Sequence, residues 1–299
     1  MNSKKKTSLI VGMGIGQLYK QVLTELGHEI VTVDPDISKN ADFPDVKAAI
    51  ISRAPFDTVH ICTPNFTHEK LAYDLAPYAS IIFIEKPGLK TKDDWLTMVY
   101  AFPQTRFIMV KNNMWRLNIK DFQGYASVSD SINLNWINKD RVPSPGSWFT
   151  NKNLSFGGVS RDLMPHLLSL YIALNPEYKS STIKSKHAIK NWNLSDLENT
   201  DYGNVNKEGV YDVDDECVIQ FESKNKVWNL TANWKSNTED DRAIHFIGHP
   251  IELNIELGLC PEIAYKLMIE DCIKNLYNSD FWKQQLEYDI WIHEQVEKF

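Results

Sequence analysis

The first 110 residues alternate between short β-rich runs and helical patterns, and no other feature of the sequence constrains the fold as strongly. The β-rich runs lie at 8–11, 29–33, 58–62, 80–84 and 106–110. Helical patterns lie between them, at 15–26, 45–53, 67–76 and 92–101. Because parallel strands are joined by helical crossovers, this alternation predicts a doubly wound parallel sheet in an α/β fold.

The sequence changes character near residue 112, where we expect a second domain to begin. Only Trp95 of the nine tryptophans precedes residue 115. Beyond this point, β-rich runs with short connections lie at 131–138, 216–223, 226–234 and 243–255, helical patterns at 160–174 and 261–297, and a long polar loop or lid at 191–216. We therefore expect a parallel-sheet domain over 1–112 and an α+β domain with a largely antiparallel sheet over 113–299.

Charge and composition exclude several classes of function. The chain has 32 Lys and Arg against 39 Asp and Glu, so its net charge of −7 gives no broad basic surface for nucleic acid or anionic lipid. The longest apolar runs, such as 81–84, are far shorter than the roughly 20 residues that span a bilayer. The basic start is not followed by a small-residue cleavage site of a signal peptide. We expect a cytoplasmic protein with no nucleic-acid or membrane partner.

Metal binding is not indicated by the sequence. The four cysteines are scattered and form no CxxC pair, which also argues against a disulfide framework. His245 and His249 have the spacing of metal ligands on a helix, but they lie in a β-rich run that is interrupted by Gly-His-Pro. We therefore expect no metal site.

Three of the 13 glycines fall within five residues, at Gly12, Gly14 and Gly16, where the first expected strand turns into the first expected helix. A diphosphate at such a turn needs close approach of the backbone and the free N–H groups of a helix N-terminus. A tight turn without a ligand also favours glycine, and Gln17 stands where GxGxxG has its third glycine. We assign Gly12, Gly14, Ile15, Gly16 and Gln17 as cofactor-binding residues of a Rossmann domain.

Asp34 ends the second expected strand, 20 residues after Gly14. An acid at this place accepts hydrogen bonds from the ribose hydroxyls of the adenosine half and repels a 2′-phosphate. Asp36 adds to the repulsion, and no arginine follows in VDPDISKN. An Asp-Pro pair also starts ordinary turns. With the glycines beside it, Asp34 favours NAD as the cofactor, with NADP less suited.

Two polar segments follow later strands of the same sheet, CTPNFTH at 62–68 and EKPG at 85–88. Ligands bind at the carboxyl ends of parallel strands, so we expect both segments at the rim of one cleft. Lys86 is a candidate for chemistry there, although a lysine at the end of a strand also extends into solvent in many proteins. The expected cofactor contacts in the two segments are Thr63, Pro64, Asn65, His68 and Glu85.

In the second domain, GGVSRDLMPH at 157–166 places Asp162 and His166 four residues apart. If Ser160 caps a helix, the two side chains share one face, so a carboxylate and an imidazole point into one cleft. A lone histidine on a helix is more often structural. The Gly-Gly turn and the nearby acid favour a catalytic pair.

Taken in order, these segments resemble those of the Gfo/Idh/MocA family of nicotinamide-dependent oxidoreductases. The resemblance covers residues 8–170 and rests on GMGIGQLY (12–19), CTPNFTH, EKPG and GGVSRDLMPH. It implies that Lys86, Asp162 and His166 are catalytic and that NAD exchanges a hydride with a secondary alcohol or ketone of a sugar-like or polyol substrate. It also implies a homo-oligomer formed through the sheet of the second domain.

Two other functions stay open at this point. The same fold can carry reduction of imines or other C=X bonds, or it can serve a ligand-sensing protein without turnover. The presence of all three catalytic residues favours the enzyme. Met164 and Pro165 stand where the family usually has a glycine before its histidine. At 299 residues the chain is also compact for the family, so the identity of the substrate does not transfer. The sequence also does not rank Lys86 against His166 as the proton acceptor.

Arg161 directly precedes Asp162 and is a candidate for substrate binding. The planar fork of arginine suits a carboxylate or a phosphate, which predicts an anionic substrate such as a uronic acid or a nucleotide-linked sugar. Trp148, in the loop before the Gly-Gly turn, is expected to reach the same cleft. The alternative is that Arg161 only forms a salt bridge with an acid of the second domain.

Overall fold

The computed structural model describes residues 5–248, 251–258 and 262–299. The chain forms two compact units, Met1–Val110 with Glu262–Glu294, and Lys111–Pro261 with Gln295–Phe299. The first stretch of the first unit ends at Val110, two residues before the boundary expected at 112. Residues 262–294, which were expected in the second domain, belong to the first unit. This difference arises because the late segment packs on the first unit through buried side chains that include Met268 and Ile269. The periodicity of a sequence does not show with which domain a helix packs.

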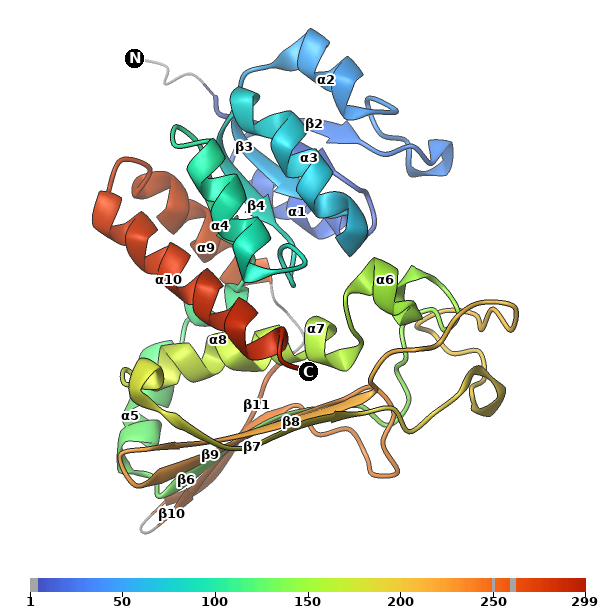
Figure 1. The fold of residues 1–299 in the computed structure, drawn as a ribbon. Helices are drawn as coiled ribbons and strands as arrows, with labels where there is room; N and C mark the ends of the chain where they lie inside the picture. The colour runs from blue at the N-terminus through green and yellow to red at the C-terminus, as the bar shows by residue number, and fades with distance from the viewer. Residues whose placement is uncertain (1–4, 249–250, 259–261) are drawn as a thin grey trace. The chain divides into compact units, whose positions relative to one another are not determined.

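The first unit contains a five-stranded, all-parallel sheet in the order β2-β1-β3-β4-β5. Strands β2, β3 and β4 are labelled in Figure 1. Its strands are β1 (Thr7–Val11), β2 (Glu29–Val33), β3 (Phe56–Ile61), β4 (Ala79–Ile84) and β5 (Arg106–Met109). The predicted doubly wound parallel sheet is confirmed. The strand order reverses at β1, and ligands of such sheets bind outside the carboxyl ends of the strands at this switch point.

The described α-helices of this unit are α1 (Gly16–Glu25), α2 (Val46–Arg53), α3 (His68–Leu75), α4 (Lys92–Ala101), α9 (Glu262–Lys274) and most of α10 (Ser279–Val296). Helices α2, α3 and α4 pack on one another in sequence, whereas α1 packs on α9. The helical pattern predicted over 261–297 forms two helices, α9 and α10, in the described residues. The chain turns after Lys274, and the side chain of Asn278 accepts a hydrogen bond from Phe281 N, which starts a new helix. Residue 261 lies outside the described residues.

The second unit contains a six-stranded sheet in the order β11-β10-β6-β9-β8-β7. Its strands are β6 (Ser131–Ile137), β7 (Thr182–Ile189), β8 (Glu216–Ser223), β9 (Lys226–Asn233), β10 (Ala243–Gly248) and β11 (Ile251–Glu256). Among the described strands of this second sheet only β6 and β9 pair in parallel, so the largely antiparallel sheet is confirmed. The run at 243–255 is a hairpin of two strands; His249 lies outside the described residues. Strand β7 was not predicted, because its side chains are mostly exposed and follow no apolar alternation.

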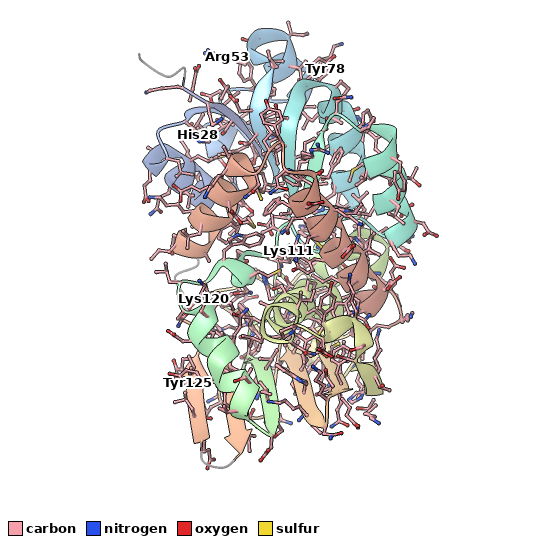
Figure 2. The ribbon with its side chains drawn as sticks, turned by 90° about the vertical axis from the view of Figure 1, so that its left-hand side faces the viewer. His28, Arg53, Tyr78, Lys111, Lys120 and Tyr125 are labelled. Carbon is pink, nitrogen blue, oxygen red and sulfur yellow. The ribbon has the colours of Figure 1, made fainter. Side chains whose placement is uncertain are left out.

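Helices α5 (Ile119–Val128) and α8 (Met164–Leu174) lie on one face of this sheet (Figure 1). Tyr125 of α5, marked in Figure 2, packs on Phe246 of β10 with ring centroids 5.6 Å apart. Two short helices, α6 (Lys152–Ser155) and α7 (Val159–Asp162), precede α8. The helical pattern predicted over 160–174 is present, but it is divided between α7 and α8. It is broken at Leu163, since Pro165 has no N–H to donate to the carbonyl four residues before it.

No helix in the described part of the chain is both long and apolar enough to cross a membrane.

Candidate active site

The glycine loop connects β1 to α1 at the carboxyl end of β1. Gly12 has a φ of +92°, and a Cβ atom at this residue would lie 2.6 Å from the carbonyl oxygen of Cys62. Gly16 begins α1, and within the described residues no side chain caps this helix. The other predicted residues of the loop are exposed around the first turn: Gly14, Ile15 and Gln17. The loop therefore offers close backbone approach and a helix N-terminus without a side-chain cap, the two features that a diphosphate needs.

Asp34 ties the end of β2 to the glycine loop. Its Oδ2 accepts a hydrogen bond from Met13 N at 2.7 Å, and its Oδ1 accepts one from Asp36 N at 2.9 Å. A carboxylate has about four acceptor sites, so Asp34 retains capacity for ribose hydroxyls. The exposed Asp36 caps the short helix η1 (Ile37–Lys39), and hydrogen bonds from Ser38 lower the pKa of Asp36. The segment after β2 thus carries negative charge next to the loop.

His68 lies in the interior of the first unit and contacts the backbone of both polar segments, 62–68 and 85–88. It is fully buried, with Nδ1 2.8 Å from the Gly88 carbonyl oxygen and Nε2 2.8 Å from the Thr63 carbonyl oxygen. Burial lowers the pKa of His68, against the opposite effect of these two carbonyl groups. Pro64 and Asn65 lie beside Thr63, at the start of the short helix η2 (Asn65–Thr67). His68 therefore holds the segments after β3 and β4 together, which differs from the expected place at the cleft surface.

Lys86 follows β4 and is half-buried, whereas the neighbouring Glu85 is buried in the interior. Oε1 of Glu85 accepts hydrogen bonds from Tyr19 Oη at 2.6 Å and from Tyr265 Oη at 3.4 Å. Burial raises the pKa of Glu85, and the nearby Lys86 opposes this shift. Because Tyr19 belongs to α1 and Tyr265 to α9, two helices fix the strand end that carries Lys86.

Two tryptophans of the sheet hold Asp162 and His166 in the second unit. Oδ2 of Asp162 accepts a hydrogen bond from Trp234 Nε1 at 2.8 Å. The ring of His166 stacks on Trp136, with centroids 5.2 Å apart and an interplanar angle of 22°, and its Nδ1 lies 3.3 Å from Asn113 Nδ2. Trp136 is in β6 and Trp234 follows β9, at the same end of this parallel pair. The sheet thus positions both groups, although the helix between them is broken.

Asp214 fixes the start of α7. Its Oδ1 accepts hydrogen bonds from Gly158 N at 3.0 Å and Ser160 Oγ at 2.9 Å, and its Oδ2 accepts one from Ser160 N at 2.7 Å. A Cβ atom on Gly158 would lie 1.7 Å from the Asp214 carbonyl oxygen, so only glycine fits. Ser160 therefore donates its hydrogen bonds to Asp214. The sequence suggested Ser160 as the N-cap residue of the helix, but the N-cap residue is Gly158. The polar stretch 191–216 packs against the turn before Asp162 at this point.

The two predicted substrate residues differ in their surroundings. Arg161 is only 6% exposed; burial lowers its pKa to about 10, and the charges of Glu297 and Asp214 oppose that shift. This environment matches the alternative in which Arg161 is part of the scaffold. Trp148 is half-buried in the short helix η5 (Trp148–Thr150) and stacks on Phe149 with centroids 3.8 Å apart.

The structure thus gathers the predicted residues in two groups, one in each unit. In the first unit, the glycine loop, Asp34 and the segments after β3 and β4 lie at the carboxyl ends of neighbouring strands. In the second unit, Asp162 and His166 lie at the ends of β6 and β9. Sequence reasoning missed Asn113, Trp136, Trp234, Asp214 and Tyr265. The tryptophans at the ends of β-rich runs were an available signal, but Tyr265 is 180 residues from Glu85 and left none.

No protein-family model and no curated protein matches the sequence. Several solved structures do match. GenD2 from gentamicin A biosynthesis, in complex with NAD, has a TM-score of 0.75 at 14% identity, over 99% of this chain and 93% of that chain. Levoglucosan dehydrogenase with NADH and levoglucosan has a TM-score of 0.74 at 15% identity, over 99% and 97%. A myo-inositol dehydrogenase from Corynebacterium glutamicum has a TM-score of 0.70 at 13% identity, over 98% and 95%.

This chain has the fold of these proteins. The fold that the resemblance to the Gfo/Idh/MocA family implies is thereby confirmed over nearly the full length of each chain.

The buried Glu85 carboxyl group predicts a pH dependence of stability. A carboxyl group whose pKa is raised on folding binds its proton more tightly in the folded state, so stability falls as pH rises from the ordinary pKa of glutamate through the raised folded value. One proton contributes a slope of at most about 1.4 kcal/mol per pH unit. Glu85→Gln keeps an oxygen for Tyr19 but does not titrate. The free energy of unfolding of this variant should therefore lack the fall with pH, when it is measured by urea titration at several pH values from 4 to ~8. The exposed Glu208→Gln should keep it, and equal slopes in the two variants would contradict the assignment.

Proposed function

We propose that this chain is an NAD-dependent oxidoreductase that transfers a hydride between nicotinamide and a secondary alcohol or ketone of a sugar-like or polyol substrate. The observation that carries the proposal is the hydrogen bond from Met13 N to Asp34, which joins an uncapped glycine-loop helix to an acid at the end of β2. GenD2 and levoglucosan dehydrogenase, which have the same fold, were solved with NAD or NADH. Two proteins of this fold are named as dehydrogenases, one of levoglucosan and one of myo-inositol. These names support the class of substrate.

The first unit has residues that fit NAD. The glycine loop would bind the diphosphate through its N–H groups, Asp34 would bind the adenosine ribose, and the segment 63–65 would complete the rim. When bound, the nicotinamide accepts or supplies the hydride. The second unit would bind the substrate, with Trp148 as a contact; Arg161 is left out of this role because it is buried beside two acids.

Lys86, Asp162 and His166 are the proposed catalytic residues. Removing a hydride from a carbinol carbon requires the hydroxyl group to lose its proton, so a base must be positioned at that oxygen. Lys86 and His166 are the two candidates for this role. All three side chains are half-buried and lie on backbone that is fixed by buried contacts, as a catalytic role requires.

We also propose that the protein is a homo-oligomer formed through the six-stranded sheet. Helices α5 and α8 of the second unit lie on one face of that sheet. On the other face, Gln220 donates to Asn229 at 2.8 Å and Asn229 donates to Asn133 at 2.9 Å, so these amides bond within the sheet and a second sheet can cover them. Val218 lies in the next row. Val218→Arg should shift the mass in light scattering from oligomer to monomer, whereas Ile51→Arg, on the exposed side of α2, should not. A wild-type monomer would contradict this proposal.

Cofactor preference tests the role of Asp34. The wild-type protein should bind NAD⁺ at least about tenfold more tightly than NADP⁺, a difference of about 1.4 kcal/mol. Asp34→Asn with Asp36→Ser removes both charges and keeps an oxygen for Met13 N, so it should narrow the preference with little loss of NAD⁺ affinity. Asp34→Ala also breaks the bond to the loop and should weaken both cofactors. Calorimetric titration measures these constants, and tighter binding of NADP⁺ by the wild-type protein would refute the assignment.

Turnover with a panel of sugars and polyols tests the function itself. Lys86→Ala should lower kcat by roughly 10²-fold or more on any substrate found, while NAD⁺ affinity is retained. Lys90→Ala, in an exposed position of the same loop, is the matched control and should leave kcat unchanged. Near-normal turnover in Lys86→Ala would remove Lys86 from the chemistry.

A further inference from the structure

A two-step hydrogen-bond relay reaches His166 from the segment that opens the second unit. Arg116 Nε donates to Asn113 Oδ1 at 3.0 Å. Asn113 Nδ2 in turn lies 3.3 Å from His166 Nδ1. Asn113 is 2% exposed and lies in the short helix η4 (Asn112–Trp115), which packs on α8. The amide is therefore held between a guanidinium and an imidazole, away from water.

The chemistry of these three groups fixes the direction of both bonds. A guanidinium has donors and no acceptor, so the oxygen of Asn113 must face Arg116. The NH₂ group of Asn113 then faces His166, and an amide nitrogen donates but does not accept. Nδ1 of His166 is consequently the acceptor, and the neutral imidazole carries its proton on Nε2. The reversed amide would bring NH₂ against the donor of Arg116.

Trp136 fixes the plane of the same ring. It stacks on the imidazole at 5.2 Å and 22°, from a strand in the interior of the sheet. A 180° flip of the ring about its Cβ–Cγ bond keeps the ring plane but puts Cδ2 in the place of Nδ1, which breaks the bond to Asn113. Trp136 thus fixes the plane of the ring, and Asn113 selects its orientation and its tautomer.

We propose that Asn113 is a positioning residue that makes His166 a hydrogen-bond donor to the substrate oxygen through Nε2–H and excludes it as the acceptor of the substrate proton. This inference rests on the proposed function. In oxidation, the carbinol C–H pair leaves as hydride to the nicotinamide, the O–H bond breaks, and its electron pair forms the C=O bond. The proton passes to a neutral amine, for which Lys86 is the candidate, and that amine becomes an ammonium group. The Nε2–H bond of His166 stays intact throughout, because its Nδ1 lone pair is held by Asn113.

Nitrogen NMR of the free protein tests the tautomer without cofactor or substrate. The ring nitrogens of the eight histidines are labelled with ¹⁵N, and the signals of His166 are identified by their loss in His166→Gln. At a pH at which the imidazole is neutral, His166 should show a protonated Nε2 and an unprotonated Nδ1. A proton on Nδ1 would overturn the inference, whatever the protein catalyses.

Asn113→Asp reverses the relay with almost no change in size. A carboxylate accepts from both Arg116 and Nδ1–H, so the proton of His166 should move to Nδ1, and its pKa should rise by about one pH unit or more. Asn118→Asp introduces the same charge at an exposed position on the same segment and should change neither property. An unchanged tautomer in Asn113→Asp, or equal changes in both variants, would overturn the role of Asn113.

The two failures can be told apart. If Nε2 is protonated but no panel sugar is oxidised, the proposed function fails and the ring assignment stands. If sugars are oxidised but Nδ1 is protonated, the function stands and His166 returns as a candidate base.

Discussion

The hydrogen bond between Met13 N and Asp34 determines how the first unit can meet a ligand. It joins the end of β2 to the loop after β1, and Gly12 N donates to the Val33 carbonyl oxygen at 2.8 Å beside it. On the other side, Gly12 packs so closely against the end of β3 that a Cβ atom does not fit. Three strand ends are thus clamped around one loop. The carboxylate of Asp34 is thereby held next to the N–H groups of that loop.

In the second unit, the side chains of Asp162 and His166 are held by residues of the sheet. Pro165 breaks the helix between Asp162 and His166, so helical spacing does not align them. Trp136 and Trp234 instead hold the two side chains from the ends of parallel strands β6 and β9, and Asp214 fixes the turn before them. Side chains locked by stacking and by hydrogen bonds lose little entropy when they act on a substrate, which is what a preorganised site requires.

Local patterns in the sequence predicted most of the fold but few of the contacts around the site. The five strands of the first sheet were found because buried parallel strands are short apolar runs, and Asp34 and the glycines were found because they stand at strand ends. Strand β7 was not predicted because its side chains are mostly exposed, so its sequence shows no alternation of apolar and polar residues. The return of α9 to the first unit, and the bonds of Glu85 and His166 to Tyr265 and Asn113, join residues distant in the chain. Such pairings depend on tertiary packing, which periodicity does not encode.

Transfer of deuterium tests the central claim most directly. Sugars and polyols deuterated at their carbinol carbons are incubated with the protein and NAD⁺, and the NADH formed is analysed by mass spectrometry. Hydride transfer predicts that at least one of these compounds yields NADH with deuterium on the nicotinamide ring. A protein that binds NAD⁺ but forms no deuterated NADH with any member of the panel would contradict the account and favour a ligand-sensing role.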